Sequence, residues 1–279
     1  FMAAARIQEL RDRFLSDQPY ATVLTPEKSL YDIASTVFAG QKVMLREHFR
    51  CVPAIIAYSN TFYDGFIQPL RIPKASERFD PPLVDIYVPG GKRGVKDVNR
   101  MEAQAILEEI EAIVANPAMT GRTIGVVSLL GPDQAKYIDE LVRSRVDAME
   151  LMQRRFDCGD ARLFQGSERD IMFLSMVADP SSCKALSGNM FEQRFNVAGS
   201  RARDRMYLVR SVQLSELLQV DIRRGMLEHF GKPLDGLGHR RAVVARDRRR
   251  PAARENAAHD HPSGLTRQAS EVGVEPLGA

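Results

Sequence analysis

The sequence is poor in cysteine, and its few cysteines show no pairing pattern. The three cysteines among 279 residues, Cys51, Cys158 and Cys183, are odd in number, far apart and in no C-x-x-C pair. This spacing disfavours a disulfide scaffold and a zinc ribbon, because both need paired or closely spaced cysteines. We therefore expect a reduced, cytoplasmic protein.

Long apolar runs are also lacking. The first residues, FMAAARIQELRDRF, contain no apolar stretch long enough for a signal peptide. No part of the chain approaches the roughly 18–20 apolar residues that cross a bilayer. We expect no membrane partner.

The chain has little net charge, and its excess of positive charge is local. The formal net charge of +3 is too small to indicate a nucleic-acid partner, because a basic total can come from one tail. Residues 240–254 contain seven Arg, one Asp and no Glu. With 44% hydrophobic residues, the chain can bury one sizeable core. We expect a helical connecting segment over 1–40, a folded domain over 41–234 and a disordered arginine-rich tail over 235–279.

Short apolar runs alternate with longer amphipathic stretches along the predicted domain. The runs at 123–130, 171–177 and 206–209 are almost continuously apolar, as in strands that are buried on both faces. The stretches between them have helical spacing. This alternation predicts an α/β fold with a parallel, doubly wound sheet flanked by helices. Ligands are then expected at the carboxyl ends of the strands.

A first candidate site segment is LREHFRCVP at 45–53. We expect the apolar run VML at 43–45 to be a buried strand that ends in charged residues at the sheet edge. Arg50 suits a phosphate, because its planar guanidinium donates two parallel hydrogen bonds and keeps its charge. The alternative is that Arg50 pairs with a neighbouring carboxylate at a helix entry.

Two further segments carry candidate groups. In FQGSERD at 164–170, Gly166 permits a tight turn and Glu168 can accept hydrogen bonds or orient an arginine, although most such turns are only turns. In NVAGSRARDR at 196–205, the arginines are two residues apart, so on a helix they cannot all face one ligand. At most one or two of them can face a common ligand, and at least one is interpreted as a solvated surface charge. A functional role is needed only for Arg201.

Together these segments resemble the C-terminal RecA-like domain of superfamily 1 helicases. The resemblance is to the AAA-type 1B branch, which includes the nonsense-mediated-decay RNA helicase and many relatives of the bacterial type. It runs from about Ser29 to Phe230. LREHFRCVPAIIAYSNTFYDG is similar to motif IV, TIGVVSLLGPDQ to the nucleic-acid-contacting segment that follows it, FQGSERD to motif V and RFNVAGSRAR to motif VI.

The resemblance implies a RecA-like P-loop NTPase fold and a role for each matching residue. Arg50 and Arg201 would contact the γ-phosphate of ATP, as an arginine finger does. Phe49 would stack on the base, its alternative being core packing. The residues that would couple the nucleotide to the strand-binding groove are Gln165, Gly166 and Glu168. Ser128 and Gln134 would lie along the nucleic-acid backbone.

The chain departs from the family pattern in two motifs. Asp160 and Arg162 stand before motif V where the family often has a hydroxyl residue and an Asp, which puts phosphate contact there in doubt. In motif VI, the common Leu-Thr is replaced by Gly199-Ser200, which leaves Arg201 in register.

The sequence also lacks a phosphate loop. No G-x-x-x-x-G-K-[ST] occurs, so the family's first RecA-like domain, with its Mg²⁺ ligands, is absent from these residues. The resemblance therefore implies the C-terminal motor domain of an ATP-dependent helicase and nucleoside-triphosphatase, inactive as the isolated chain. Its partners would be single-stranded DNA or RNA and the missing domain, in cis or in trans.

Two other functions remain as alternatives. One is a non-catalytic nucleic-acid-binding module that kept the helicase fold, although such a module has no need of γ-phosphate contacts. The other is a nuclease. It is disfavoured because the chain has no E-x-K triplet, and its HDH run at 259–261 falls in the predicted tail.

Overall fold

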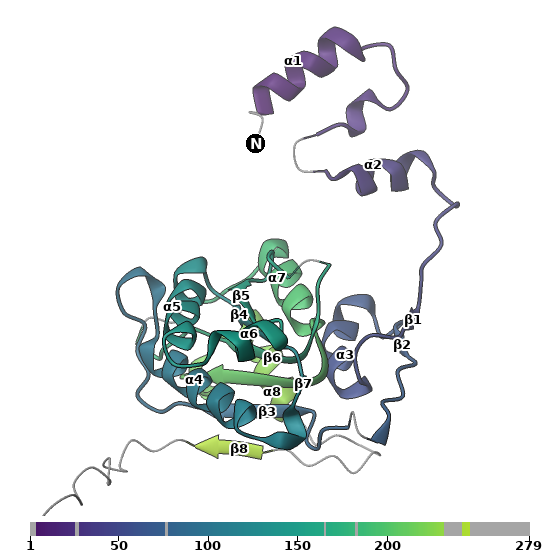
Figure 1. Cartoon of the computed structure of the whole chain (residues 1–279). Coiled ribbons are helices and arrows are strands. Elements are labelled where there is room, and N and C mark those ends of the chain that lie inside the picture. The colour runs from purple at the N-terminus through teal and green to yellow at the C-terminus, as the bar shows by residue number, and fades with distance from the viewer. Residues whose placement is uncertain are drawn as a thin grey trace, which may run out of the picture.

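A six-stranded parallel sheet forms the centre of the protein (Figure 1). The computed structural model describes residues 4–25, 28–75, 78–164, 166–181, 184–231 and 242–245. The sheet order is β5-β4-β6-β7-β3-β8, and every pairing in it is parallel. Its strands are β3 (Leu83–Tyr87), β4 (Ile124–Ser128), β5 (Asp157–Asp160), β6 (Arg169–Ser175), β7 (Ala202–Arg210) and β8 (Ala242–Ala245).

Helices cover both faces of this sheet, which confirms the predicted doubly wound α/β architecture. One buried cluster joins the sheet to α4 (Arg100–Val114), α5 (Pro132–Arg143) and α6 (Ala148–Gln153). A second cluster joins the opposite face to α3 (Pro53–Asn60), α7 (Asn189–Gly199) and α8 (Ile222–Gly231). The sheet therefore lies between two apolar layers.

The continuous apolar run in β6 follows from this burial on both faces. Successive side chains of a strand point to opposite faces. Ile171 and Phe173 pack in the cluster beneath α4, whereas Met172 and Leu174 pack in the cluster beneath α3. All four are fully buried. A strand in this position has no polar face, so its sequence does not alternate.

The N-terminal helices lie apart from the sheet (Figure 1). They are α1 (Ala4–Phe14) and α2 (Leu30–Val37), and neither contains a buried residue. Ser29 caps α2: its hydroxyl accepts a hydrogen bond from the Asp32 amide, and the Asp32 carboxylate accepts one from the Ser29 amide. Short 3₁₀ turns span Ala21–Val23, Thr61–Tyr63, Val95–Asp97, Pro117–Met119 and Leu214–Glu216.

The expectation of a buried strand at 43–45 is wrong. Val43 and Leu45 are 83% and 89% exposed, and the segment has no regular structure. A short strand, β1 (Glu47–His48), follows it and pairs in parallel with β2 (Gln68–Pro69) in a separate two-stranded sheet. Three apolar residues do not form a buried strand without neighbours to supply hydrogen bonds and packing, and none of the described strands pairs with 43–45.

The predicted tail contains one element in its described part. Ala242–Ala245 form β8, which pairs with Val84–Tyr87 at the outer side of β3. The expectation of no regular structure over 235–279 therefore fails at these four residues. The edge of β3 offers unpaired backbone groups that an apolar Ala-Val-Val-Ala stretch can satisfy. The other positions of 235–279 lie outside the described residues.

Candidate nucleotide-contact site

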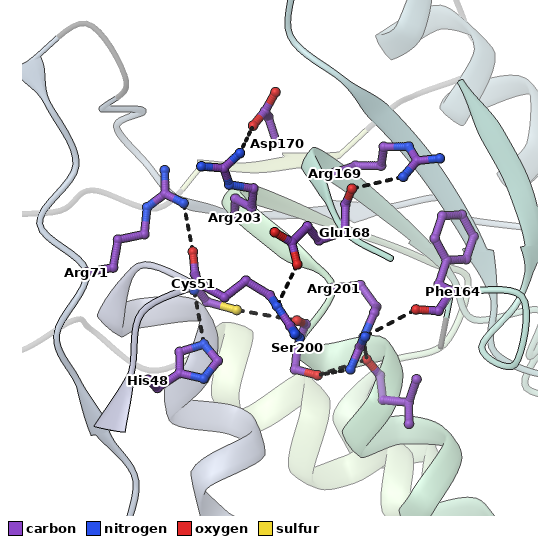
Figure 2. Close-up of polar contacts among 12 residues, drawn as sticks. His48, Cys51, Arg71, Phe164, Glu168, Arg169, Asp170, Ser200, Arg201 and Arg203 are labelled. Carbon is purple, nitrogen blue, oxygen red and sulfur yellow. Dashed lines mark hydrogen bonds and ion pairs between the residues drawn. The ribbon is translucent and has the colours of Figure 1, made fainter. Parts of the chain in front are cut away.

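The three candidate segments meet at the amino ends of β6 and β7 (Figure 2). Glu168 immediately precedes β6, and Arg201 stands between α7 and β7. The turn that carries Arg50 joins them, because the Val52 amide donates to the Arg203 carbonyl at 3.0 Å. The expectation of a site at the carboxyl ends of the strands is therefore wrong for these residues. They lie on the connections that enter the strands, whereas the carboxyl-end rule concerns residues that follow them.

Arg50 is paired with another predicted site residue. Its Nε lies 2.7 Å from Oε2 of Glu168, with the two side chains 33% and 40% exposed. The alternative that Arg50 pairs with a carboxylate is thus correct, but the carboxylate comes from the motif V segment and not from its own helix entry. Arg50 and Glu168 remain half-exposed, so an anion from outside can reach the Arg50 guanidinium.

Arg201 is held by backbone and hydroxyl oxygens on its own side of the site. Its Nε donates to the Val197 carbonyl at 2.9 Å, and its Nη1 donates to the Phe164 carbonyl at 3.1 Å. Its Nη2 donates to the Ser200 hydroxyl at 3.1 Å. Because a guanidinium has five N–H donors, these contacts fix its plane and leave two donors for a ligand.

Two positive charges therefore face the same site. Burial, followed by the nearby charge of Arg50, lowers the pKa of Arg201 below its ordinary value. The guanidinium keeps its charge at neutral pH, since the pKa of arginine lies far above 7. A half-buried pair of like charges is stabilised by an anion that binds both. The arrangement suits a phosphate group.

Packing explains the small residues before Arg201, Gly199 and Ser200. A Cβ at Gly199 would lie 2.5 Å from Cδ1 of Tyr58 in α3, so only glycine permits this contact between α7 and α3. The Ser200 hydroxyl donates to the Val197 carbonyl and accepts from Arg201. The departure from Leu-Thr thus preserves both the helix packing and the support of Arg201.

The motif V turn forms as expected around Gly166. Its φ is +84°, and a Cβ there would meet nothing within 4 Å, so the backbone conformation and not lack of space favours glycine. Gln165 lies outside the described residues. Upstream, Asp160 and Arg162 pair with each other at 2.6 Å, and Arg162 is 81% exposed.

Phe49 is available for stacking. Its side chain is 64% exposed next to the Arg50 turn. The alternative that Phe49 packs in the core is therefore wrong, and its contact with a base remains a prediction. Aromatic faces of this kind are used by proteins that bind nucleotides or single strands, because every base has a π-face.

The assignment of Ser128 and Gln134 to a nucleic-acid surface is wrong. Both residues are fully buried. The side-chain Oε1 of Gln134 accepts from the backbone amide of Asn99 at 2.8 Å. Its Nε2 donates to the backbone carbonyl of Asn99 and to the Ser175 hydroxyl. Ser128 accepts from the Gly131 amide at 3.3 Å. These groups hold the carboxyl ends of the strands together and do not face solvent.

Sequence reasoning missed the buried carboxylate in this network. Glu102 is fully buried and accepts hydrogen bonds from the Ser175 and Ser211 hydroxyls at 2.8 and 3.0 Å, and from the Val177 amide at 2.8 Å. Burial raises the pKa of Glu102 to about 7. Its spacing from Asn99 predicts a capping box, and the Asn99 side chain does cap α4. The Glu102 carboxylate instead fixes α4 to the ends of β6 and β7.

A basic hollow at the carboxyl edge was also missed. It has a volume of about 770 Å³ and is lined by the loop after β3 and by Tyr137 of α5. Lys92, Lys96 and Arg100 line it and are exposed, and the Arg100 guanidinium lies 5.7 Å from the centre of the Tyr137 ring. The GGKRGVK run at 90–96 is the sequence signal.

Among the described residues, no cluster of three or more His, Cys, Asp or Glu side chains could hold a metal ion. Within the described part of the chain, every helix is too short or too polar to traverse a bilayer.

Comparison with known proteins places these features in a family. The 5'-3' DNA helicase ZGRF1 of Mus musculus is 28% identical over 224 residues, which cover 76% of this chain and 11% of that protein. The C-terminal domain of a possible DNA helicase from Lactobacillus plantarum has a TM-score of 0.38 and 12% identity, over 63% of this chain and 96% of that domain. A family model described as AAA domain matches residues 27–213, more than half of the chain. The chain therefore belongs to this AAA-domain family, which is of the superfamily 1 helicase type.

Proposed function

We propose that this chain is the C-terminal motor domain of an ATP-dependent DNA or RNA helicase. The convergence of Arg50, Glu168 and Arg201 at one edge of the sheet is the observation that supports this most strongly. Arg50 and Arg201 would donate to the γ-phosphate and stabilise the charge of the transferring phosphoryl group. Phe49 would stack on the base of the nucleotide.

Glu168 would act as the internal partner that a phosphate replaces. Its carboxylate now occupies the hydrogen-bonding position of Arg50 at 2.7 Å. A γ-phosphate that arrives at Arg50 competes with this carboxylate, because both are anionic oxygen acceptors for the same guanidinium. Nucleotide binding would thereby release Glu168 and change the turn after Gly166, which is how the motif V segment would sense the nucleotide.

The remaining parts of the reaction would come from a first RecA-like domain. That domain would carry the phosphate loop and the Mg²⁺ ligands, in cis or in trans. The chain spans about 11% of the length of the helicase relative that it matches. The activity of a whole helicase is therefore proposed for the completed motor and not for this chain alone.

Single-stranded nucleic acid would bind at the basic hollow of the carboxyl edge. Lysines and arginines gain affinity by neutralising phosphates, and an aromatic ring offers a platform for a base. Lys92, Lys96, Arg100 and Tyr137 supply both kinds of group. They take the role that Ser128 and Gln134, being buried, cannot fill.

ATP turnover tests the proposal. We expect the isolated chain to show no turnover above background. Joined downstream of a first RecA-like domain that has a phosphate loop and Mg²⁺ ligands, it should show magnesium-dependent turnover that Arg50→Ala strongly reduces but leaves measurable. Turnover by the isolated chain that Arg50→Ala abolishes would contradict the proposal. A joined protein that binds nucleic acid but never turns over ATP would instead favour the non-catalytic binding module.

Salt-dependent binding tests the nucleic-acid surface. The chain truncated after Ala245, which keeps β8, should bind single-stranded oligonucleotides weakly, with an affinity that falls as salt rises. Lys92→Ala/Lys96→Ala should reduce the slope of log K against log salt by about 0.7 for each lysine that contacts a phosphate. Fluorescence anisotropy over a salt series measures this slope.

A charge-matched pair of arginines serves as the control. Arg143 and Arg145 lie at and just beyond the end of α5 and pair with Asp139 and Glu111. Their replacement by Ala should leave the slope unchanged. If truncation after Ala245 removes all binding, the arginine-rich residues beyond it are the binding element and the hollow is not.

A further inference from the structure

Arg71 approaches the backbone beside Cys51 from a separate loop (Figure 2). It lies just after β2, and its side chain is 8% exposed. Its Nη1 donates to the Arg50 carbonyl at 2.7 Å. Its Nη2 donates to Oδ1 of Asp204 in β7. One guanidinium therefore bridges the peptide of Arg50 and the strand that follows Arg201.

Asp204 is a fixed acceptor for this bridge. It is 2% exposed and belongs to a strand in the interior of the sheet. Arg122 approaches its other oxygen, Oδ2, at 3.5 Å. Burial raises the pKa of Asp204 to about 6, and the charges of Arg71 and Arg122 oppose this effect. The carboxylate is thus ionised at neutral pH, and the strand holds it in place.

Cys51, which follows Arg50, is attached to the residue that precedes Arg201. The Cys51 amide donates to Nε2 of His48 at 3.0 Å, and the Cys51 thiol donates to the Ser200 carbonyl at 3.4 Å. These contacts fix Cys51, the residue that follows the Arg50 carbonyl. Arg71 fixes the carbonyl itself, so the starting point of the Arg50 side chain is set relative to Arg201.

We infer that Arg71 is a positioning residue for Arg50. It places the Arg50 guanidinium where it can act on the same phosphate as Arg201. This inference rests on the proposed function, in which both arginines contact one γ-phosphate. Two donors that must meet one group tolerate little displacement, since a shift of about 1 Å can cost on the order of 10² in rate.

The position of Arg50 can be measured in the chain itself, without ATP turnover. In ¹⁵N spectra of arginine side chains, the Nε–H of Arg50 should exchange slowly with water because it is paired with Glu168. Arg71→Ala should accelerate this exchange at least about tenfold, which is the loss expected for one charge-assisted hydrogen bond of roughly 1.5 kcal/mol. Arg71→Lys should give an intermediate rate, because an ammonium keeps the charge beside Asp204 but lacks the planar fork that bridges both acceptors.

Arg122→Ala is the matched control for the exchange measurement. It removes the other arginine on Asp204 and the contact of that guanidinium with the Phe79 ring. The exchange of the Arg50 Nε–H should stay at the wild-type rate. Unchanged exchange in Arg71→Ala, or equal acceleration in Arg122→Ala, would overturn the inference. If Arg71→Ala does not fold, the comparison of Arg71→Lys with Arg122→Ala decides in the same way.

The motor completed with a first RecA-like domain gives an independent measurement. Arg71→Ala should lower kcat by on the order of 10²-fold with nucleic-acid affinity unchanged. Adding Arg71→Ala to Arg50→Ala should cause little further loss, since the positioned group is already gone. Additive losses would contradict positioning. If Arg50→Ala alone leaves turnover intact, the proposed function fails, and the exchange of the Nε–H still decides whether Arg71 positions Arg50.

Discussion

Arg201→Ala is expected to reduce kcat of the completed two-domain motor by on the order of 10³-fold, with nucleic-acid affinity nearly unchanged. A finger arginine acts on charge that develops as the phosphoryl group transfers, so its loss affects the transition state more than binding. Arg201→Lys should rescue little, because a lysine cannot hold the Val197 and Phe164 carbonyls and a phosphate with one planar group. Steady-state ATPase and anisotropy measurements separate the two effects.

Arg203 is the internal control for this prediction. Its side chain is 43% exposed and pairs with Asp170 at 3.6 Å, away from Arg201 (Figure 2). An exposed pair of this kind contributes about 1 kcal/mol or less. Arg203→Ala should therefore leave turnover almost intact. If Arg203→Ala abolishes turnover and Arg201→Ala is tolerated, the assumed motif register is wrong by two residues.

Asp221→Ala should destabilise the domain by about 3–5 kcal/mol, because it leaves a buried arginine without its counter-ion. Asp221 precedes α8 and is paired with Arg223, and both side chains are 1% exposed. Arg223 also donates to the Lys184 carbonyl at 2.6 Å. The pair thus attaches the start of α8 to the segment before α7. Urea denaturation monitored by circular dichroism gives the free energy of unfolding.

Two further variants show whether the buried unpaired charge of Arg223 causes the loss of stability in Asp221→Ala. Asp221→Ala/Arg223→Met should be less destabilising than Asp221→Ala alone, because it removes the stranded charge. Lys136→Ala breaks an exposed pair with Glu140 on α5 and should cost about 1 kcal/mol or less. A double variant less stable than Asp221→Ala would mean that packing of the Arg223 side chain, and not its charge, is the main contribution.

The sheet could be predicted because its central strands are buried on both faces. The runs around β4, β6 and β7 are almost continuously apolar, a pattern typical of strands buried on both faces. The helices between them are marked by caps such as Asn99 and by prolines at the first turn, such as Pro132. The run at 43–45 shows the limit of this reasoning, because an apolar composition indicates burial only where neighbouring elements exist to cover it.

The site could be predicted only in part. The resemblance identified Arg50, Glu168 and Arg201, which the fold brings together, but not the edge of the sheet on which they lie. A polar residue that ends a strand can point into the interior or into solvent, and the sequence does not distinguish the two, as the buried Ser128 at the end of β4 demonstrates. Arg71 could not be recognised either, since its partners come from distant positions in the chain and no local spacing indicates them.

The strands β6 and β7 connect the edge of the sheet that carries Arg201 with the edge that carries the Glu102 network. Arg201 and Glu168 stand at their amino ends, and the Glu102 network that anchors α4 stands at their carboxyl ends. Seven residues of β6 span roughly 20 Å at about 3.3 Å per residue. Close-packed interiors compress little and transmit strain. A displacement imposed on the arginines is therefore expected to reach the far edge as a movement of the whole sheet, and not to be absorbed within it.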